Sequence, residues 1–301
     1  MNRNPLTLIH TFPGTTWRND STPAFRVRSI LRPSGSGSSF TLTPAESFSP
    51  AESSQECPRI QGLDYHGRRR AGRSAGDFVD FISRDAASLA VCVGAVSAHE
   101  PDSSLLASGL QTLLCDSGTQ AMVRPAAIAR SLNRSVCSAP GDDSHATLFY
   151  ARVDSLRREL CYVNAGHEPA LLFRKRQSRA IALESTGAVL GLTPRSAYGQ
   201  RTIPLEPGDL LAVFSEGLAE AVDILGRPFG YAGVLSVLRR SQCGRAADLV
   251  QEILDAAERH AGWGMPSADQ TVAVVRFTGG MDKALPAEAE TELAYAVARA
   301  C

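Results

Sequence analysis

The sequence lacks a net charge and a long apolar run, and each absence excludes a class of protein. Its 31 basic residues balance 31 acidic ones, so no overall field attracts the chain to nucleic acid or an anionic membrane. The longest apolar run, Leu89 to Val96, is far shorter than the roughly 20 residues that a membrane helix needs. The N-terminus has no basic region followed by an apolar core, so the expected location is cytoplasmic.

Cysteine chemistry is also restricted. The seven cysteines include no CxxC pair and no metal-like spacing, which argues against a disulfide framework and against a zinc site. Cys92 and Cys161 lie inside apolar runs and are expected to be buried, reduced thiols. What remains is a chain of 301 residues, 44% of them apolar, which can bury the core of one large domain or two small ones. The oligomeric state is not indicated.

The composition changes along the chain and predicts three parts. Residues 1–57 are rich in Ser, Thr, Pro and Gly without a sustained period, and are expected to be disordered. Residues 58–278 alternate short apolar runs with turn residues and helical patches, as a folded domain does. Residues 279–301 are expected to be a tail with a short amphipathic helix.

The pattern within the domain predicts an α+β fold, because strand runs are interrupted by pairs of helices without strict alternation. The expected strands are Phe78 to Ile82, Leu89 to Val96, Thr147 to Val153, Leu160 to Asn164, Ala170 to Phe173, Leu210 to Phe214 and Thr271 to Phe277. The expected helices are Ser103 to Cys115, Pro125 to Val136, Tyr231 to Arg240 and Ala246 to His260.

Acidic residues stand at the ends of three expected strands. Asp77 precedes one strand, Glu216 follows another, and Asp269 precedes the last. Carboxylates collected at strand ends are a common way for a sheet to bind hard divalent ions. Turn chemistry is the simpler alternative, since Asp is frequent in turns for backbone reasons.

Six stretches occur together in a particular order: GDFVDF, GAVSAHEPDSSLLAS, TLFYARVD, YVNAGHEPALL, LEPGDLLAVFSEGLAEAVD and ADQT. In order, spacing and character they resemble the metal-dependent protein phosphatase (PPM) superfamily, and in particular its bacterial SpoIIE-type branch. The corresponding family motifs are GGDYYDF, GDVSGKG, TLFYGVLD with YVNAGHNPPLL, LxPGDLLLLYTDGVTEARN, and DDxT. The resemblance covers roughly 220 residues, too many for a chance motif match.

This resemblance implies a four-layer α-β-β-α sandwich of two antiparallel sheets flanked by helices. It also implies two Mg²⁺ or Mn²⁺ ions that activate a water for attack on a phosphoserine or phosphothreonine. The implied partner is a phosphoprotein, such as an anti-sigma-factor antagonist in bacterial signalling. Neither nucleic acid nor a membrane is an expected partner.

The sequence departs from the family at the metal ligands. Asp77 matches the family aspartate of GGD, and Glu216 replaces the aspartate of the TDG turn with a carboxylate one methylene longer. Ala95 stands where the family has the aspartate shared by both ions, and Ala268 replaces the first aspartate of DDxT, whose second matches Asp269. Asp77, Glu216 and Asp269 are therefore the expected metal ligands, and weak or absent ion occupancy is expected.

Four further residues are expected to act around the metal site. Arg73 is expected to contact a substrate phosphate, and Asp80, Glu220 and His167 to surround the ligands, although solvated or purely structural roles explain each of them. A substitute ligand from the loop residues His99, Glu100 or Asp102 is left open.

Two functions follow from this pattern. One is a SpoIIE-type serine/threonine phosphatase with weak or lost activity. The other is a pseudophosphatase that docks a phosphorylated anti-sigma-factor antagonist without hydrolysis. The number of retained ligands favours the second, and a decayed gene product is a third possibility.

Overall fold

The computed structural model describes residues 59–74, 76–83, 85–97, 102–118, 124–139, 144–262 and 264–279. The predicted N-terminal segment, the loop residues His99 and Glu100, and the tail from residue 280 lie outside this part of the chain. For Asp102, only the backbone is described.

The described residues form two five-stranded sheets in which all neighbouring strands are antiparallel. The first sheet has the order β1 (Leu63–Arg70), β10 (Gln270–Phe277), β9 (Leu210–Phe214), β6 (Ala170–Arg174) and β7 (Arg179–Leu183). The second has the order β2 (Asp77–Ser83), β3 (Ser88–Ser97), β4 (His145–Asp154), β5 (Glu159–Ala165) and β8 (Arg201–Pro204).

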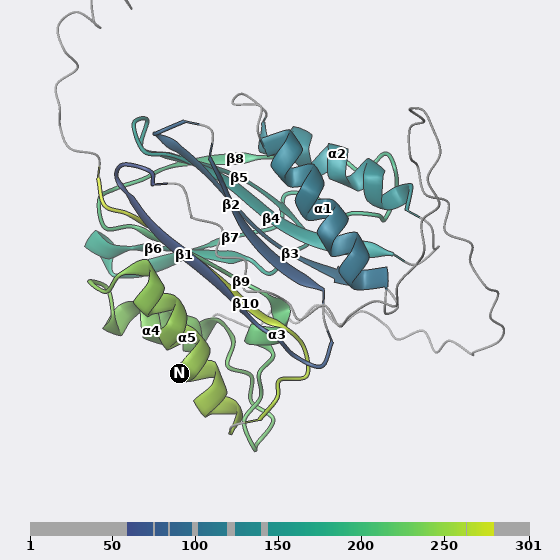
Figure 1. Ribbon diagram of the computed structural model, residues 1–301. Coiled ribbons are helices and arrows are strands. Elements are labelled where there is room, and N and C mark those ends of the chain that lie inside the picture. The colour runs from purple at the N-terminus through teal and green to yellow at the C-terminus, as the bar shows by residue number, and fades with distance from the viewer. Residues whose placement is uncertain are drawn as a thin grey trace, which may run out of the picture. The chain divides into compact units, whose positions relative to one another are not determined.

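Helices cover the outer face of each sheet (Figure 1). The second sheet is covered by α1 (Asp102–Gly118) and α2 (Pro125–Cys137), and the first by α4 (Gly230–Arg240) and α5 (Ala246–Ala261). Two short elements, η1 (Lys175–Gln177) and α3 (Glu216–Ala219), follow β6 and β9. The four-layer α-β-β-α sandwich predicted from the sequence is thereby confirmed. Among the described helices, none has the length and apolar character that a bilayer crossing requires.

The longest apolar run of the sequence forms the strand β3, which is covered on both faces. Leu89, Val91 and Val93 point into the core between the two sheets, whereas Ala90 and Cys92 point into the core beneath α1 and α2. Side chains alternate along a strand, so a strand that is covered on both faces is apolar at successive positions. On α2, the predicted stripe of Ile128, Leu132 and Val136 packs into the same outer core.

The topology brings distant segments to one end of the sandwich. Asp77, at the start of β2, is the partner of Ala95 near the end of β3. The first turn of α3 follows β9, and the segment before β10 lies against it: a Cβ on Gly217 would stand 2.3 Å from the carbonyl oxygen of Asp269. Only glycine permits this close approach of the two backbones.

Candidate functional site

A cleft of about 420 Å³ opens at this end of the sandwich. All five positions that the metal argument singles out line it: Asp77, Ala95, Glu216, Ala268 and Asp269. They come from β2, β3, the start of α3 and the segment before β10. The structure therefore brings together residues that are separated by up to about 190 positions in the chain.

Asp77 is the retained carboxylate at the centre of this arrangement. Its Oδ2 accepts a hydrogen bond from Thr271 Oγ1 at 2.8 Å. Burial raises the pKa of Asp77 to about 6, although hydrogen bonds from Ser215 and Thr271 oppose the shift. Burial in the cleft therefore disfavours the charged form of this carboxyl group.

Asp269 is engaged differently, because four donors of the protein already surround its carboxylate. Oδ1 accepts from the backbone N–H of Gly72 at 2.9 Å, and Oδ2 from that of Gly76 at 3.2 Å. The backbone N–H of Asp77 and the guanidinium of Arg69 also donate to Oδ2, at 3.4 and 3.1 Å. Asp269 thus ties the connection between β1 and β2 to the start of β10, and its role as a metal ligand stays a prediction.

The remaining acids of the cleft lie close to one another. Burial is the main cause that raises the pKa of Glu216, and repulsion from Glu220 and Glu168 adds to it. Glu168 accepts a hydrogen bond from the Tyr231 hydroxyl of α4. Among the described lining residues there is no Lys or Arg, so the cleft has an acidic lining.

His167 lines the cleft but is almost completely buried. Its Nδ1 lies 2.9 Å from Thr147 Oγ1, and its backbone N–H donates to Asn164 Oδ1 at 2.9 Å. Burial lowers the pKa of His167 to about 4, so the ring is neutral at physiological pH. The contacts match the structural hydrogen-bonding role that the sequence suggests for this turn.

The other predicted residues divide between the cleft and its surroundings. Glu220 lines the cleft. Arg73 is exposed and is not among the lining residues, so its contact with a substrate phosphate stays a prediction. Asp80 accepts a hydrogen bond from Gln111 of α1 at 2.9 Å and likewise does not line the cleft.

A two-ion centre makes demands that these side chains do not meet. Two divalent ions bring about four positive charges and need several oxygen ligands. Ala95 and Ala268 present methyl groups to the cleft, and the oxygens of Asp269 are occupied by protein donors. Within the described residues, no three His, Cys, Asp or Glu side chains are placed to hold a metal ion. The donor set therefore does not fit the two-ion centre that the resemblance implies.

Comparison with known proteins decides the family. The sequence matches the family profile of Stage II sporulation protein E (SpoIIE) over residues 85–278. The chain belongs to the SpoIIE family. It is 27% identical over 188 residues to the phosphoserine phosphatase RsbU of Bacillus subtilis strain 168. That match covers 62% of this chain and 54% of RsbU, so this SpoIIE-family chain corresponds to about half the length of that relative.

Solved structures share the fold. The RsbU and RsbW domains of Rv1364c from Mycobacterium tuberculosis superpose with a TM-score of 0.63 at 23% identity, over 75% of this chain and 64% of that one. The catalytic domain of the serine/threonine protein phosphatase PstP, solved in complex with two manganese ions, gives 0.55 at 15% identity, over 71% and 97%. At these identities the likeness concerns the fold, which is that of the PPM phosphatases.

Sequence reasoning misses three residues that shape the cleft. Arg69 pairs with Asp269, Thr271 donates to Asp77, and the Ser215 hydroxyl accepts from the backbone N–H of Thr271 at 3.0 Å. Thr271 is the threonine of the ADQT motif and Ser215 precedes Glu216, so their place beside the motif acids was a usable signal. Arg69 is one of several arginines before Asp77, and the sequence alone does not distinguish it from its neighbours.

Proposed function

We propose that this chain is a SpoIIE-type serine/threonine phosphatase domain in which hydrolysis of phosphoserine or phosphothreonine is weak or lost. Under this proposal it retains the fold as a module that docks a phosphorylated signalling protein. The name of the relative RsbU, a phosphoserine phosphatase, suggests a phosphoserine protein as the partner, and the family resemblance suggests an anti-sigma-factor antagonist.

One observation carries this proposal: alanine stands at both cleft positions where the family supplies carboxylates. In a two-metal phosphatase, the ions position the attacking water and neutralise the charge that develops on the phosphoryl oxygens. Asp77 and Glu216 leave too few oxygens for two ions about 3.5 to 4 Å apart. Because Asp269 is held by backbone N–H groups and by Arg69, it is not a ready substitute.

The acids that line the cleft also affect substrate binding. A phosphomonoester carries nearly two negative charges, and the lining residues described here offer no Lys or Arg to meet them. Without cations, the phosphoryl group would be repelled by Glu216, Glu220 and Glu168. Docking is therefore expected to depend on contacts outside the phosphate subsite.

Restoring the ligands tests the proposal. The double variant Ala95→Asp with Ala268→Asp is expected to bind Mn²⁺ more tightly than the unmodified chain and to hydrolyse a phosphoserine peptide faster. The gain should exceed the sum of the single changes, since the ligands act as one unit. Calorimetric Mn²⁺ titration and phosphate release measure the two effects.

Measurements on the unmodified chain can contradict the proposal. Vigorous Mn²⁺-dependent turnover by this chain, abolished by Asp77→Ala, would contradict the loss of activity and show that another ligand completes the site. Absence of any gain in the double variant, with normal folding by circular dichroism, would show that the two alanines do not limit the chemistry.

A further inference from the structure

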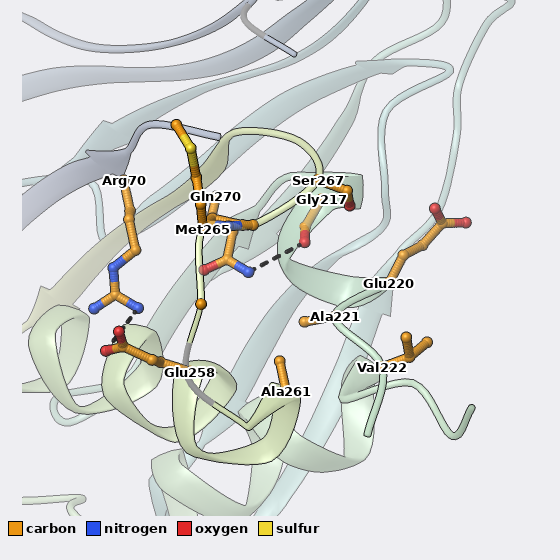
Figure 2. Close-up of a pocket in the computed structure, with 12 residues that line it drawn as sticks. Arg70, Gly217, Glu220, Ala221, Val222, Glu258, Ala261, Met265, Ser267 and Gln270 are labelled. Carbon is orange, nitrogen blue, oxygen red and sulfur yellow. Dashed lines mark hydrogen bonds and ion pairs between the residues drawn. The ribbon is translucent and has the colours of Figure 1, made fainter. Parts of the chain in front are cut away.

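A second pocket adjoins the acidic cleft and is lined by none of the expected metal ligands. It has a volume of about 180 Å³ and shares three residues with the cleft: Gly217, Glu220 and Ser267. Figure 2 shows that its other residues come from the end of β1, from the segment after α3, from α5, and from the start of β10 and the segment before it. The two hollows therefore adjoin each other.

The pocket combines apolar walls with a neutralised polar end. Apolar side chains supply much of the lining: Ala221, Val222, Ala261, Met265 and Pro266. At one end Arg70 forms an ion pair with Glu258, N to O 3.3 Å (Figure 2), and a second with Asp255 at 3.2 Å, so its positive charge is offset. An apolar cavity of about 150 Å³ is large enough for a benzene molecule. A leucine-sized side chain therefore fits this pocket.

Large aliphatic side chains are exposed beside the pocket. Val222 and Met265 line it and are 49% and 64% exposed, and Ile224 and Leu225 on the adjoining turn are 96% and 69% exposed. Single exposed aliphatic residues are ordinary, but two that line one hollow, followed along the chain by two more on the adjoining turn, favour a binding surface.

The turn that carries these residues is held in place by its own hydrogen bonds. Asp223 Oδ1 accepts from the backbone N–H groups of Leu225 and Arg227 at 2.8 and 2.9 Å, and its Oδ2 pairs with the Arg227 guanidinium at 2.7 Å. His260 of α5 contacts the Arg227 carbonyl oxygen at 2.8 Å. The aliphatic side chains are thus presented on a preorganised backbone, which reduces the entropy lost on binding.

The charges beside the pocket indicate which second side chain a partner segment would carry. Where the pocket meets the cleft, Glu220 forms no ion pair within the described residues, and Glu216 and Glu168 lie nearby in the cleft. Arg70 is paired with both Asp255 and Glu258 and leaves no positive charge over, so the junction is negative. A basic side chain placed there would gain a favourable interaction that an acidic one would not.

We propose that this pocket and the turn at Val222–Leu225 dock an extended segment of a partner protein. That segment carries a leucine-sized aliphatic side chain for the pocket and, within a few residues, a basic side chain for Glu220. The inference rests on the proposed function, because it names the contacts through which the domain holds its signalling partner. Since the two hollows share residues and an extended chain advances about 3.3 Å per residue, roughly two to four residues separate the two anchors.

The test uses the full chain and fluorescein-labelled nonapeptides with a central serine. One pair of peptides carries arginine next to the serine and leucine three residues before or after it; matched peptides replace leucine with aspartate or arginine with glutamate. Fluorescence anisotropy measures the Kd. We expect the better leucine–arginine peptide to bind at least about tenfold more tightly than its aspartate counterpart, since burial of a leucine side chain stabilises a complex.

Variants of the protein locate the effect. Val222→Asp and Met265→Asp should each remove the preference for leucine, and Ile224→Ser, at a fully solvated position, should weaken it without affecting folding. Leu156→Asp is the matched control. Leu156 is 78% exposed in the turn after β4, whereas Thr147 near the start of β4 lines the cleft. This control should leave the preference unchanged.

Three results would overturn the proposal: no measurable binding of any peptide, equal affinities for the leucine and aspartate peptides, or an equal loss in Leu156→Asp. Anisotropy does not depend on hydrolysis. A leucine preference in a chain that proves to be an active phosphatase would therefore reject the proposed function and leave this docking surface standing. An inactive chain without a leucine preference would reject the docking surface and leave the proposed function standing.

Discussion

Replacing Asp269 with alanine tests whether this acid is a structural anchor or a metal ligand. Its side chain is buried, and it accepts hydrogen bonds from the backbone N–H groups of Gly72, Gly76 and Asp77 and from Arg69. Asp269→Ala removes the acceptor and leaves these donors behind, the N–H of Gly76 in a buried position. The predicted result is a large loss of stability that does not depend on metal.

The magnitude follows from the contacts. Hydrogen bonds to a charged group contribute about 1.5 to 3 kcal/mol each, and a buried donor left without its partner costs about 1 to 3 kcal/mol. Because the four contacts share one carboxylate, their contributions do not add, and we expect Asp269→Ala to lower the free energy of unfolding by about 3 to 5 kcal/mol. Arg69→Ala should cost less than about 1.5 kcal/mol, since its side chain is 37% exposed and the pair is partly screened.

Urea unfolding in EDTA, followed by circular dichroism, measures both variants in the absence of metal. A loss below about 1 kcal/mol for Asp269→Ala in EDTA would refute the anchoring role. If the same variant lost stability only when Mn²⁺ was present, Asp269 would be acting as a ligand in the unmodified protein. The two readings of this residue therefore predict different metal dependence.

Two further predictions concern the burial of the site and its close backbone packing. Burial lowers the pKa of His167 from 6.5 to about 4, so its ring should lower the stability by about 3 kcal/mol as the pH falls from 6.5 to 4. Asp77, with a pKa raised to about 6, shifts the stability the opposite way in this window, so the His167 contribution is the difference between the profiles of the unmodified chain and His167→Gln. Gly217→Ala should cost about 1 to 3 kcal/mol, because its Cβ would stand 2.3 Å from the Asp269 carbonyl oxygen. Gly109→Ala, whose Cβ meets nothing within 4 Å on helix α1, is the control and should stabilise by up to about 1 kcal/mol. Urea unfolding of each variant checks both predictions. Identical pH profiles of the unmodified chain and His167→Gln, or equal effects of the two glycine changes, would contradict them.

Most strands that the sequence predicts have side chains buried on both faces, although the predicted β2 is largely half-buried. The expected runs that became β3 and β9 are almost wholly apolar, so period and composition agree. The strand β1 was not predicted because it reads LDYHGRRR, with three successive arginines. It forms because all eight of its residues pair with β10, a long-range interaction that outweighs local composition.

Some features of the site were also predictable from the sequence and others were not. Motif order was sufficient to predict that Asp77, Glu216 and the Ala268–Asp269 pair meet, because the strands that carry them are recognisable. It was not sufficient to predict the direction of the Asp269 side chain. That direction depends on the backbone N–H groups of Gly72 and Gly76, in a connection whose conformation no local pattern specifies.

The fold tolerates alanine at the metal positions because main-chain pairing shapes the cleft. Ala95 is paired with Asp77 on one side and with Thr147 on the other, and these ladder contacts involve no side chain. An aspartate at position 95 would add a second negative charge beside Asp77, whose pKa burial already raises. A bound cation offsets such repulsion, and without one a carboxyl group there is protonated more readily. Alanine at these two positions removes metal ligands, and it also removes the repulsion that additional carboxylates would cause in a site without metal. The cleft therefore keeps its form although the donor set for two ions is gone.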